Sequence, residues 1–243
     1  MNQKKALLAL ALIAVSLKYS ACVKPTITPT VEPTPSPSPS QVEIEKGAFD
    51  ACAKRSWKNR GVAPLSYFQE IAVSYHKAFC SKQEFPKMGI DKDALLYYGL
   101  PQDLISTYTL LIGLGLREST GNFCSGRDTS ASNLDAMTAE AGAFQSSYNS
   151  MRAHPKLREI FEFYKNNPTA CGETKPKCSS QNYGTGEGAD FQRLSKTCPQ
   201  FVVLYNAFLI RVLRKHFGPL LRREAEFVPA CRDMLKAIEK NAC

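Results

Sequence analysis

The residue with the clearest chemical potential is a glutamate that follows a long apolar stretch. Glu118 stands two positions after the stretch 104–116, which is rich in leucine and isoleucine. A carboxyl group at the carboxy-terminal end of a buried helix lies in a low dielectric and beside the negative end of the helix dipole. Both effects disfavour ionisation, and an acid that stays protonated near neutral pH can donate a proton to a glycosidic oxygen. The position of Glu118 therefore predicts a general acid.

Two other segments accompany this glutamate in a fixed order. Glu118 opens the sequence Glu-Ser-Thr-Gly-Asn, and Ala-Gly-Ala-Phe-Gln begins at Ala141. A third segment, Tyr-Asn-Ala, begins at Tyr205. The pattern resembles the lytic transglycosylase and g-type lysozyme group of the lysozyme-like superfamily, in which Glu-Ser-x-Gly precedes a Gly-Leu-Met-Gln-like and a Tyr-Asn-Ala-Gly segment. The resemblance covers about residues 65–218, and Phe208 stands where the third segment has glycine.

This resemblance implies an exported bacterial muramidase that cleaves the β-1,4 bonds between MurNAc and GlcNAc in peptidoglycan without a cofactor. It implies that Glu118 is the catalytic acid and that Ser119 orients this carboxylate or contacts sugar. Gly142 would let the backbone approach the glycan, and Gln145 would donate hydrogen bonds in the cleft. Tyr205 would face the catalytic glutamate.

The presence or absence of a second carboxylate would decide between hydrolysis and formation of a 1,6-anhydro product. The carboxylates on the way to the second segment are Asp128, Asp135 and Glu140. In an inverting hydrolase, such a group activates water about 6.5–9.5 Å from the acid. Without it, the substrate's own carbon-6 hydroxyl attacks and gives a 1,6-anhydro product, as in lytic transglycosylases. We favour hydrolysis, with Asp128 or Asp135 as the second carboxylate because both lie in the loop expected to border the cleft.

The same loop suggests what the site could recognise. Carboxylates such as Asp128 could pair with the free ammonium of an N-deacetylated sugar, which would favour deacetylated glycan. Arg127 could bind a muramyl lactyl or stem-peptide carboxylate, or could instead pair with Asp128. The departures at Phe208 and in the segment Gly142-Ala143-Phe144 leave a further alternative, a peptidoglycan-binding lipoprotein without activity.

The elements that must position these residues are mainly helical. Apolar spacing predicts an all-α, or mainly helical α+β, fold. The resemblance implies that this fold is lysozyme-like, with a disulfide-stapled long loop. Helices are expected over 65–79, 100–116, 150–165, 198–218 and 234–240. The helix before Glu118 is apolar nearly all round and should be central and buried. Long loops are expected over 121–141 and 171–188, with a small β-hairpin in 122–138.

The amino terminus and the cysteines indicate export. Residues 1–21 resemble a signal peptide, and the small residues before Cys22 resemble a lipoprotein cleavage site. Residues 22–41 would then be a lipidated, Pro/Thr/Ser-rich linker, and 42–243 the catalytic domain. Of nine cysteines, eight remain for disulfides of unknown pairing. They are Cys52, Cys80, Cys124, Cys171, Cys178, Cys198, Cys231 and Cys243. No Cys-x-x-Cys pair occurs and the histidines are scattered, so no metal site is predicted.

The charge favours an anionic partner. The chain has a formal charge of +9, and loss of Lys4, Lys5 and Lys18 with the signal gives 9 − 3 = +6. Such a protein suits cell-wall polymers and lipid headgroups, whereas nucleic acid is disfavoured. The basic run from Arg211 to Arg223 is expected to be a solvated helix face. We expect a monomer, either a periplasmic or outer-membrane lipoprotein or a secreted protein, with peptidoglycan and the membrane as its partners.

Overall fold

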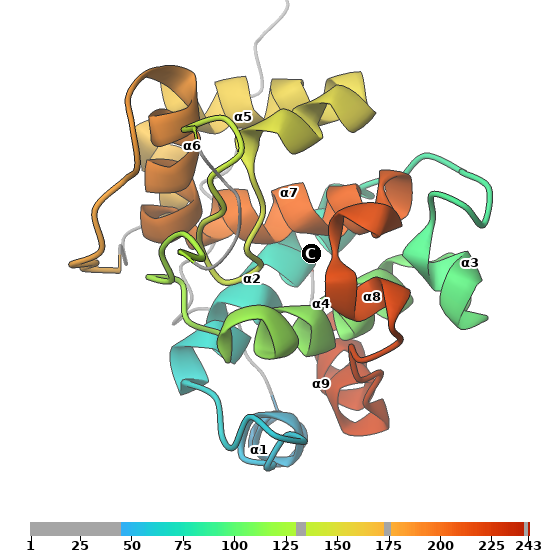
Figure 1. The fold of residues 1–243 in the computed structure, drawn as a ribbon. Helices are drawn as coiled ribbons and strands as arrows, with labels where there is room; N and C mark the ends of the chain where they lie inside the picture. The colour runs from blue at the N-terminus through green and yellow to red at the C-terminus, as the bar shows by residue number, and fades with distance from the viewer. Residues whose placement is uncertain (1–44, 130–134, 173–175, 241–242) are drawn as a thin grey trace, which may run out of the picture. The chain divides into compact units, whose positions relative to one another are not determined.

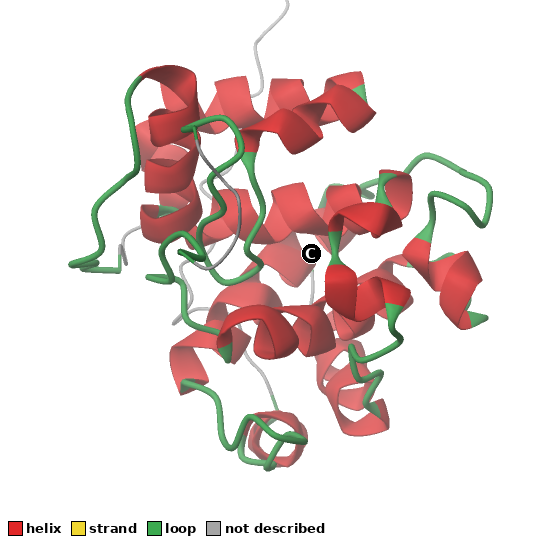
Figure 2. Cartoon of the chain, viewed as in Figure 1, coloured by secondary structure: helices red, strands yellow, loops and turns green. Residues whose placement is uncertain are grey.

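The described part of the chain is helical. The computed structural model describes residues 45–129, 135–172, 176–240 and 243. The predicted signal peptide, Cys22 and the linker lie outside these residues. Within them, β-pairing is limited to two isolated bridges, Trp57 with Gly61 and Ala141 with Ser146. The all-α prediction is thus confirmed (Figure 2), while the hairpin expected in 122–138 has no strand in its described part.

Figure 1 shows how the helices are arranged. They are α1 (Lys46–Ala53), α2 (Leu65–Cys80), α3 (Ala94–Tyr98), α4 (Leu104–Ser119), α5 (Pro155–Asn166), α6 (Gly186–Thr197), α7 (Pro199–Val212), α8 (Gly218–Leu221) and α9 (Pro229–Glu239). Among the described residues they are joined by the 3-10 turns η2 (Tyr148–Ala153), η3 (Pro168–Cys171) and η4 (Arg214–His216). No helix among the described residues is long and apolar enough to cross a membrane.

Helix α4 is the buried central helix that the sequence predicts. Every residue from Ile105 to Leu116 is buried, and α4 contacts α2, α7 and α9. Glycines permit this close packing: a Cβ at Gly113 would lie 2.0 Å from the carbonyl oxygen of Glu226. The helix begins later than expected, at Leu104, because the Asp103 carboxylate caps it by accepting the amide of Ser106 at 2.7 Å.

The other predicted helices are confirmed with shifted ends. Helix α7 begins at Pro199 as expected but ends at Val212, and Gly218-Pro219 opens α8 rather than closing α7. The helix expected over 150–165 divides at His154, where the chain extends before α5. Helix α6 was not predicted; it begins inside a glycine-rich segment that we expected to be a loop.

All eight cysteines beyond residue 50 are paired. The pairs are Cys52–Cys231, Cys80–Cys243, Cys124–Cys178 and Cys171–Cys198. The first joins α1 to α9, and the last joins the turn η3 to the start of α7. Disulfides are typical of oxidising compartments, so the pairing supports an exported protein.

A buried ion pair fixes α7 against its neighbours. Arg211 Nε donates to Asp93 Oδ2 at 2.9 Å, and the two side chains are 2% and 0% exposed. Asp93 also caps α3 by accepting the amide of Leu95 at 2.8 Å. Arg211 Nη1 donates to Thr107 on α4 at 3.1 Å. The expectation of a solvated basic face is therefore wrong for Arg211, whose charge is neutralised in the core.

Removing the charge of Asp93 should be costly. Asp93→Asn keeps an acceptor for Leu95 but leaves the Arg211 guanidinium buried without a counter-ion, which typically costs about 3–5 kcal/mol. Urea unfolding of the oxidised protein measures this loss. Asp233→Asn is the matched control, because Asp233 forms an exposed ion pair with Lys236 at 3.8 Å and should lose less than about 1 kcal/mol. Equal losses in the two variants would contradict the assigned role.

Candidate functional site

The end of α4 places Glu118 where the chain turns sharply. Thr120 and Gly121 both have left-handed backbone angles, with φ of 58° and 73°. The amide of Gly121 donates to the carbonyl of Gly115 at 3.1 Å, which closes the helix end. A Cβ at Gly121 would lie 2.7 Å from the ring of Tyr67 on α2, so only glycine fits there. The sequence Glu-Ser-Thr-Gly thus ends the central helix directly after the half-buried Glu118.

The Glu118 carboxyl group is a weak acid in this environment. Its pKa is raised to about 8, mainly by burial and secondly by the nearby charge of Glu140. The guanidinium groups of Arg222, Arg60 and Arg117 act in the opposite direction, in that order of size. The raised pKa agrees with the expectation for a carboxyl group at the end of a buried helix. At neutral pH, Glu118 is therefore largely protonated and able to donate a proton.

Ser119 joins the first two segments of the pattern. Its hydroxyl group donates to the carbonyl oxygen of Ala143 at 2.7 Å and accepts the amide of Asn122 at 3.0 Å. This hydroxyl hydrogen is committed to the backbone, so Ser119 connects the helix end to the segment 141–146. The expected contacts of Ser119 with the carboxylate or with sugar are not part of this geometry.

The segment 141–146 is a tight turn held by its own backbone. The amide of Ala141 donates to Ser146 O at 3.1 Å, and the Gln145 side-chain amide folds back onto Gly142 O at 3.0 Å. Gly142 has φ of 78°, and a Cβ there would lie 2.5 Å from the carbonyl oxygen of Ser195 on α6. Gly142 is therefore needed for packing against α6, and its expected approach to glycan stays a prediction. Gln145 stays half-buried at the same turn.

Tyr205 lies in the core, which corrects its expected place opposite the glutamate. Its side chain is 0% exposed, its hydroxyl group hydrogen-bonds Ser150 at 2.7 Å, and its ring packs against Phe191 at 5.1 Å. The third segment instead acts through Asn206, a residue that the sequence analysis did not single out. Asn206 Nδ2 donates to Ser146 Oγ at 3.2 Å and so fixes the turn 141–146 to α7.

The loop carboxylates differ in what they do. Asp135 caps a turn by accepting the amide and the hydroxyl group of Thr138 at 2.8 and 3.0 Å, and these bonds lower its pKa. Asp128 is exposed. Neither is among the charges that mainly shift the pKa of Glu118, whereas Glu140 is the first of them. Of the three loop carboxylates, Glu140 is therefore the one whose charge acts mainly on Glu118.

Three guanidinium groups border Glu118 and are held in place. Arg60 Nη2 donates to the carbonyl oxygen of Arg117 at 2.6 Å. Arg117 and Arg222 both bind the Glu224 carboxylate, at 3.2 and 2.9 Å. A rim of fixed positive charge attracts anionic polymers. Arg127 is not part of this rim; its guanidinium carbon lies 4.0 Å from the ring centre of Tyr183.

No residues suited to a metal ion gather at this site. Among the described residues, no group of three or more histidine, cysteine, aspartate or glutamate side chains could hold one. The chemistry that the site offers is therefore that of a protonated carboxyl group, an adjacent carboxylate and a basic rim.

The comparisons with known proteins assign no family to this chain. Family models, curated proteins and solved structures were each compared with it, and none of the three gave a match.

The pKa of Glu118 should appear in the pH dependence of stability. A glutamate in an unfolded chain has a pKa of about 4.3. Because the folded pKa is higher, near 8, the unfolded state is favoured progressively as pH rises from 4.3 to 8. Glu118→Gln should therefore match the wild type in urea unfolding at pH 4 and be more stable at pH 8. Glu159→Gln, which alters an exposed ion pair, should show no such divergence. A wild type as stable as Glu118→Gln at both pH values would contradict the raised pKa.

Proposed function

We propose that the chain is a lysozyme-like peptidoglycan hydrolase that cleaves β-1,4 bonds between MurNAc and GlcNAc. The observation that carries this proposal is the pKa of Glu118, near 8, beside the charge of Glu140. A largely protonated carboxyl group beside a second carboxylate can serve as the general acid in glycoside cleavage. The rim of Arg60, Arg117 and Arg222 suits the anionic wall polymer.

In the proposed reaction, Glu118 donates its proton to the oxygen of the glycosidic bond as that bond breaks. Water attacks the anomeric carbon and loses its proton to the carboxylate of Glu140, which gives a new reducing end. The transition state carries positive charge on the sugar, and an ionised Glu140 would stabilise it. Glu140 then releases its proton to solvent and Glu118 takes one up from solvent, which restores both groups.

The proposed membership in the lytic transglycosylase and g-type lysozyme group rests on the order of the motif segments. The hydrogen bond from Ser119 to Ala143 brings the first two segments into contact, and Asn206 joins the third to the second. We also propose export by residues 1–21 and lipidation of Cys22, both of which lie outside the described residues. The four disulfides support an exported location.

Glu118→Gln tests the catalytic role. General acids typically contribute about 10²–10⁴-fold, so release of soluble fragments from purified peptidoglycan should fall by at least about 100-fold. Glu159→Gln should keep full activity. A Glu118→Gln variant as active as the wild type would exclude this assignment.

Product mass then identifies the reaction. Products with a free reducing end indicate hydrolysis, and products lighter by one water indicate the 1,6-anhydro form of a lytic transglycosylase. Wild-type protein that pellets with peptidoglycan but releases no fragments would instead be a binding lipoprotein without activity.

The role of Glu140 can be separated from that of Glu118. A carboxylate beside the scissile bond would pair with the ammonium of N-deacetylated glycan, so we expect faster cleavage of deacetylated than of acetylated wall. Glu140→Gln should slow hydrolysis, because this carboxylate accepts the proton of the attacking water, and the remaining activity should no longer prefer deacetylated wall. The same substitution should also move the alkaline limb of the pH–activity profile to lower pH, because the loss of a neighbouring negative charge lowers the pKa of Glu118. Faster cleavage of acetylated wall by the wild type would argue against the ammonium contact.

A further inference from the structure

A concave site lies beyond the turn 141–146. A cavity of about 180 Å³ opens where the chain after Asp135 meets η2 and the start of α5. Its lining residues are Met137, Tyr148, Asn149, Met151, Arg152 and Arg158. Neither Glu118 nor Glu140, the proposed catalytic pair, is among these lining residues.

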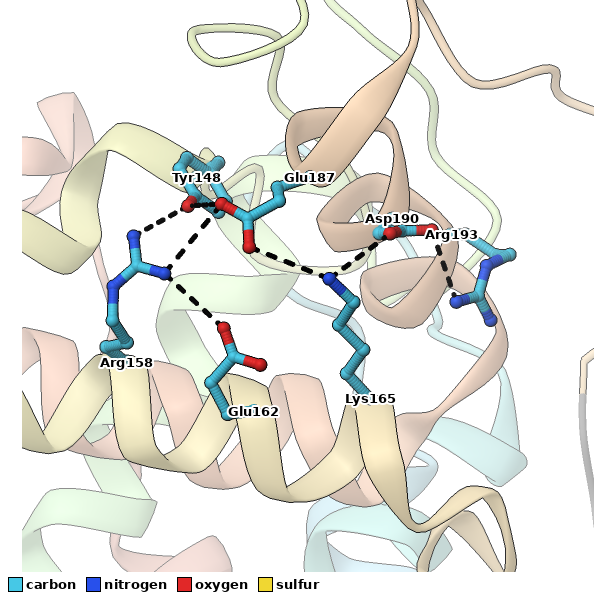
Figure 3. A network of polar contacts seen from close by, with 7 residues as sticks. All are labelled: Tyr148, Arg158, Glu162, Lys165, Glu187, Asp190 and Arg193. Carbon is cyan, nitrogen blue, oxygen red and sulfur yellow. Dashed lines mark hydrogen bonds and ion pairs between the residues drawn. The ribbon is translucent and has the colours of Figure 1, made fainter.

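One wall of the cavity is held by a network of polar contacts, shown in Figure 3. Arg158 Nη2 donates to the hydroxyl group of Tyr148 at 2.6 Å, and that hydroxyl group donates to the carboxylate of Glu187. The charged members of the network are three cations, Arg158, Lys165 and Arg193, and three carboxylates, Glu162, Glu187 and Asp190. The three positive and three negative formal charges cancel, so the network has no net charge. Its contacts hold Tyr148 and Arg158 in place as one wall of the cavity.

The other polar side chains that line the cavity, those of Asn149 and Arg152, have hydrogen-bond donors without an acceptor among the described residues. The Asn149 side-chain oxygen accepts the hydroxyl group of Ser147 at 2.8 Å, and its backbone amide donates to Met137 O at 3.0 Å. Among the described residues, no acceptor is found for the Asn149 side-chain NH₂ and no carboxylate pairs with the exposed Arg152. The cavity therefore offers an amide donor and an uncompensated guanidinium group to a ligand.

The apolar residues of the lining further restrict the class of ligand that fits the cavity. Met137 and Met151 supply soft, adaptable surface next to these donors. A guanidinium group and an amide donor complement the two oxygens of a carboxylate, and methionine side chains accommodate a methyl group. A cavity of about 180 Å³ has room for a ligand of a few heavy atoms. A small carboxylate on a methyl-bearing carbon satisfies all of these conditions.

We propose that this cavity binds such a carboxylate of the cell wall, through Arg152 and Asn149, with the methyl group against the two methionines. This assignment of the ligand rests on the proposed function. Two parts of peptidoglycan have the required chemistry: the lactyl group of muramic acid and the terminal D-alanine of a stem peptide. The turn 141–146 joins Glu140 to the residues of the cavity wall, so catalysis and recognition would share one short segment.

Isothermal titration of the cleavage-deficient Glu118→Gln protein tests this proposal without turnover. The ligands are N-acetylmuramic acid, N-acetylglucosamine, which lacks the lactyl carboxylate, and D-alanyl-D-alanine. We expect saturable binding of at least one carboxylate ligand, at least tenfold tighter than that of N-acetylglucosamine. Preference for N-acetylmuramic acid identifies the lactyl group, and preference for the dipeptide identifies the stem.

Two variants locate the binding, each made in the same Glu118→Gln background. Asn149→Asp keeps the acceptor for Ser147 but places a negative charge in the cavity, so carboxylate binding should weaken at least tenfold. Arg152→Gln should weaken it severalfold, and because Arg152 is exposed this variant should fold normally. Lys236→Gln, which removes an exposed cation of α9 that belongs neither to the lining nor to the network of Figure 3, should bind as before.

Equal binding of N-acetylmuramic acid and N-acetylglucosamine, unchanged binding in a folded Asn149→Asp variant, or no carboxylate binding would each overturn the proposal. These outcomes are independent of catalysis. A cavity that binds carboxylates in a chain whose wild type never cleaves wall would refute only the proposed function.

Discussion

The candidate site depends on one hydrogen bond, from the hydroxyl group of Ser119 to the carbonyl oxygen of Ala143 at 2.7 Å. The two residues belong to segments that are 24 positions apart, and this bond holds the turn 141–146 against the end of α4. Glu118 precedes the donor by one residue, and Glu140 precedes the acceptor by three. The bond therefore keeps both carboxyl groups in one region of the molecule. Asn206 supports it from α7 by binding Ser146.

The acid strength of Glu118 follows from how α4 is packed. Helix α4 is buried on all sides, so neighbouring segments still cover part of its last turn. The left-handed backbone angles of Thr120 and Gly121 end the helix immediately after that turn. Gly115 allows Tyr67 to approach α4 closely; a Cβ there would lie 2.3 Å from the tyrosine oxygen. Tight packing keeps water away from the carboxyl group, and burial is accordingly the largest cause of its raised pKa. The packing of the core around α4 therefore determines the acid strength of Glu118.

The sequence predicted the features that depend on local pattern. The central helix follows from an uninterrupted apolar stretch, and the start of α7 follows from Pro199, whose fixed φ suits a first turn. The start of α4 was missed because the Asp103 cap outweighs the signal from Pro101. Glu118 could be singled out because its environment is determined by its own helix.

What the sequence did not predict depends on contacts between distant segments. Tyr205 has the residue type expected of a cleft, but the face of α7 that it occupies is decided by packing against Phe191 on α6. Arg211 looks like a surface arginine until Asp93, 118 positions away, supplies its buried partner. Glu140 was weighed below Asp128 and Asp135 because only the folded turn shows which carboxylate acts on Glu118. The spacing of residues along the chain does not show which of them lie close together in the folded protein.

The charges around Glu118 argue that desolvation, rather than a single neighbour, controls the proposed acid. Three guanidinium groups favour its ionised form, yet the pKa still rises to about 8. The arginines exert little control because their hydrogen bonds go elsewhere, to Glu224 and to the carbonyl oxygen of Arg117. A bound glycan would exclude more water and so raise the pKa further, while the same rim remains available to anionic groups of the polymer. Substrate binding would then strengthen the protonated state that catalysis needs.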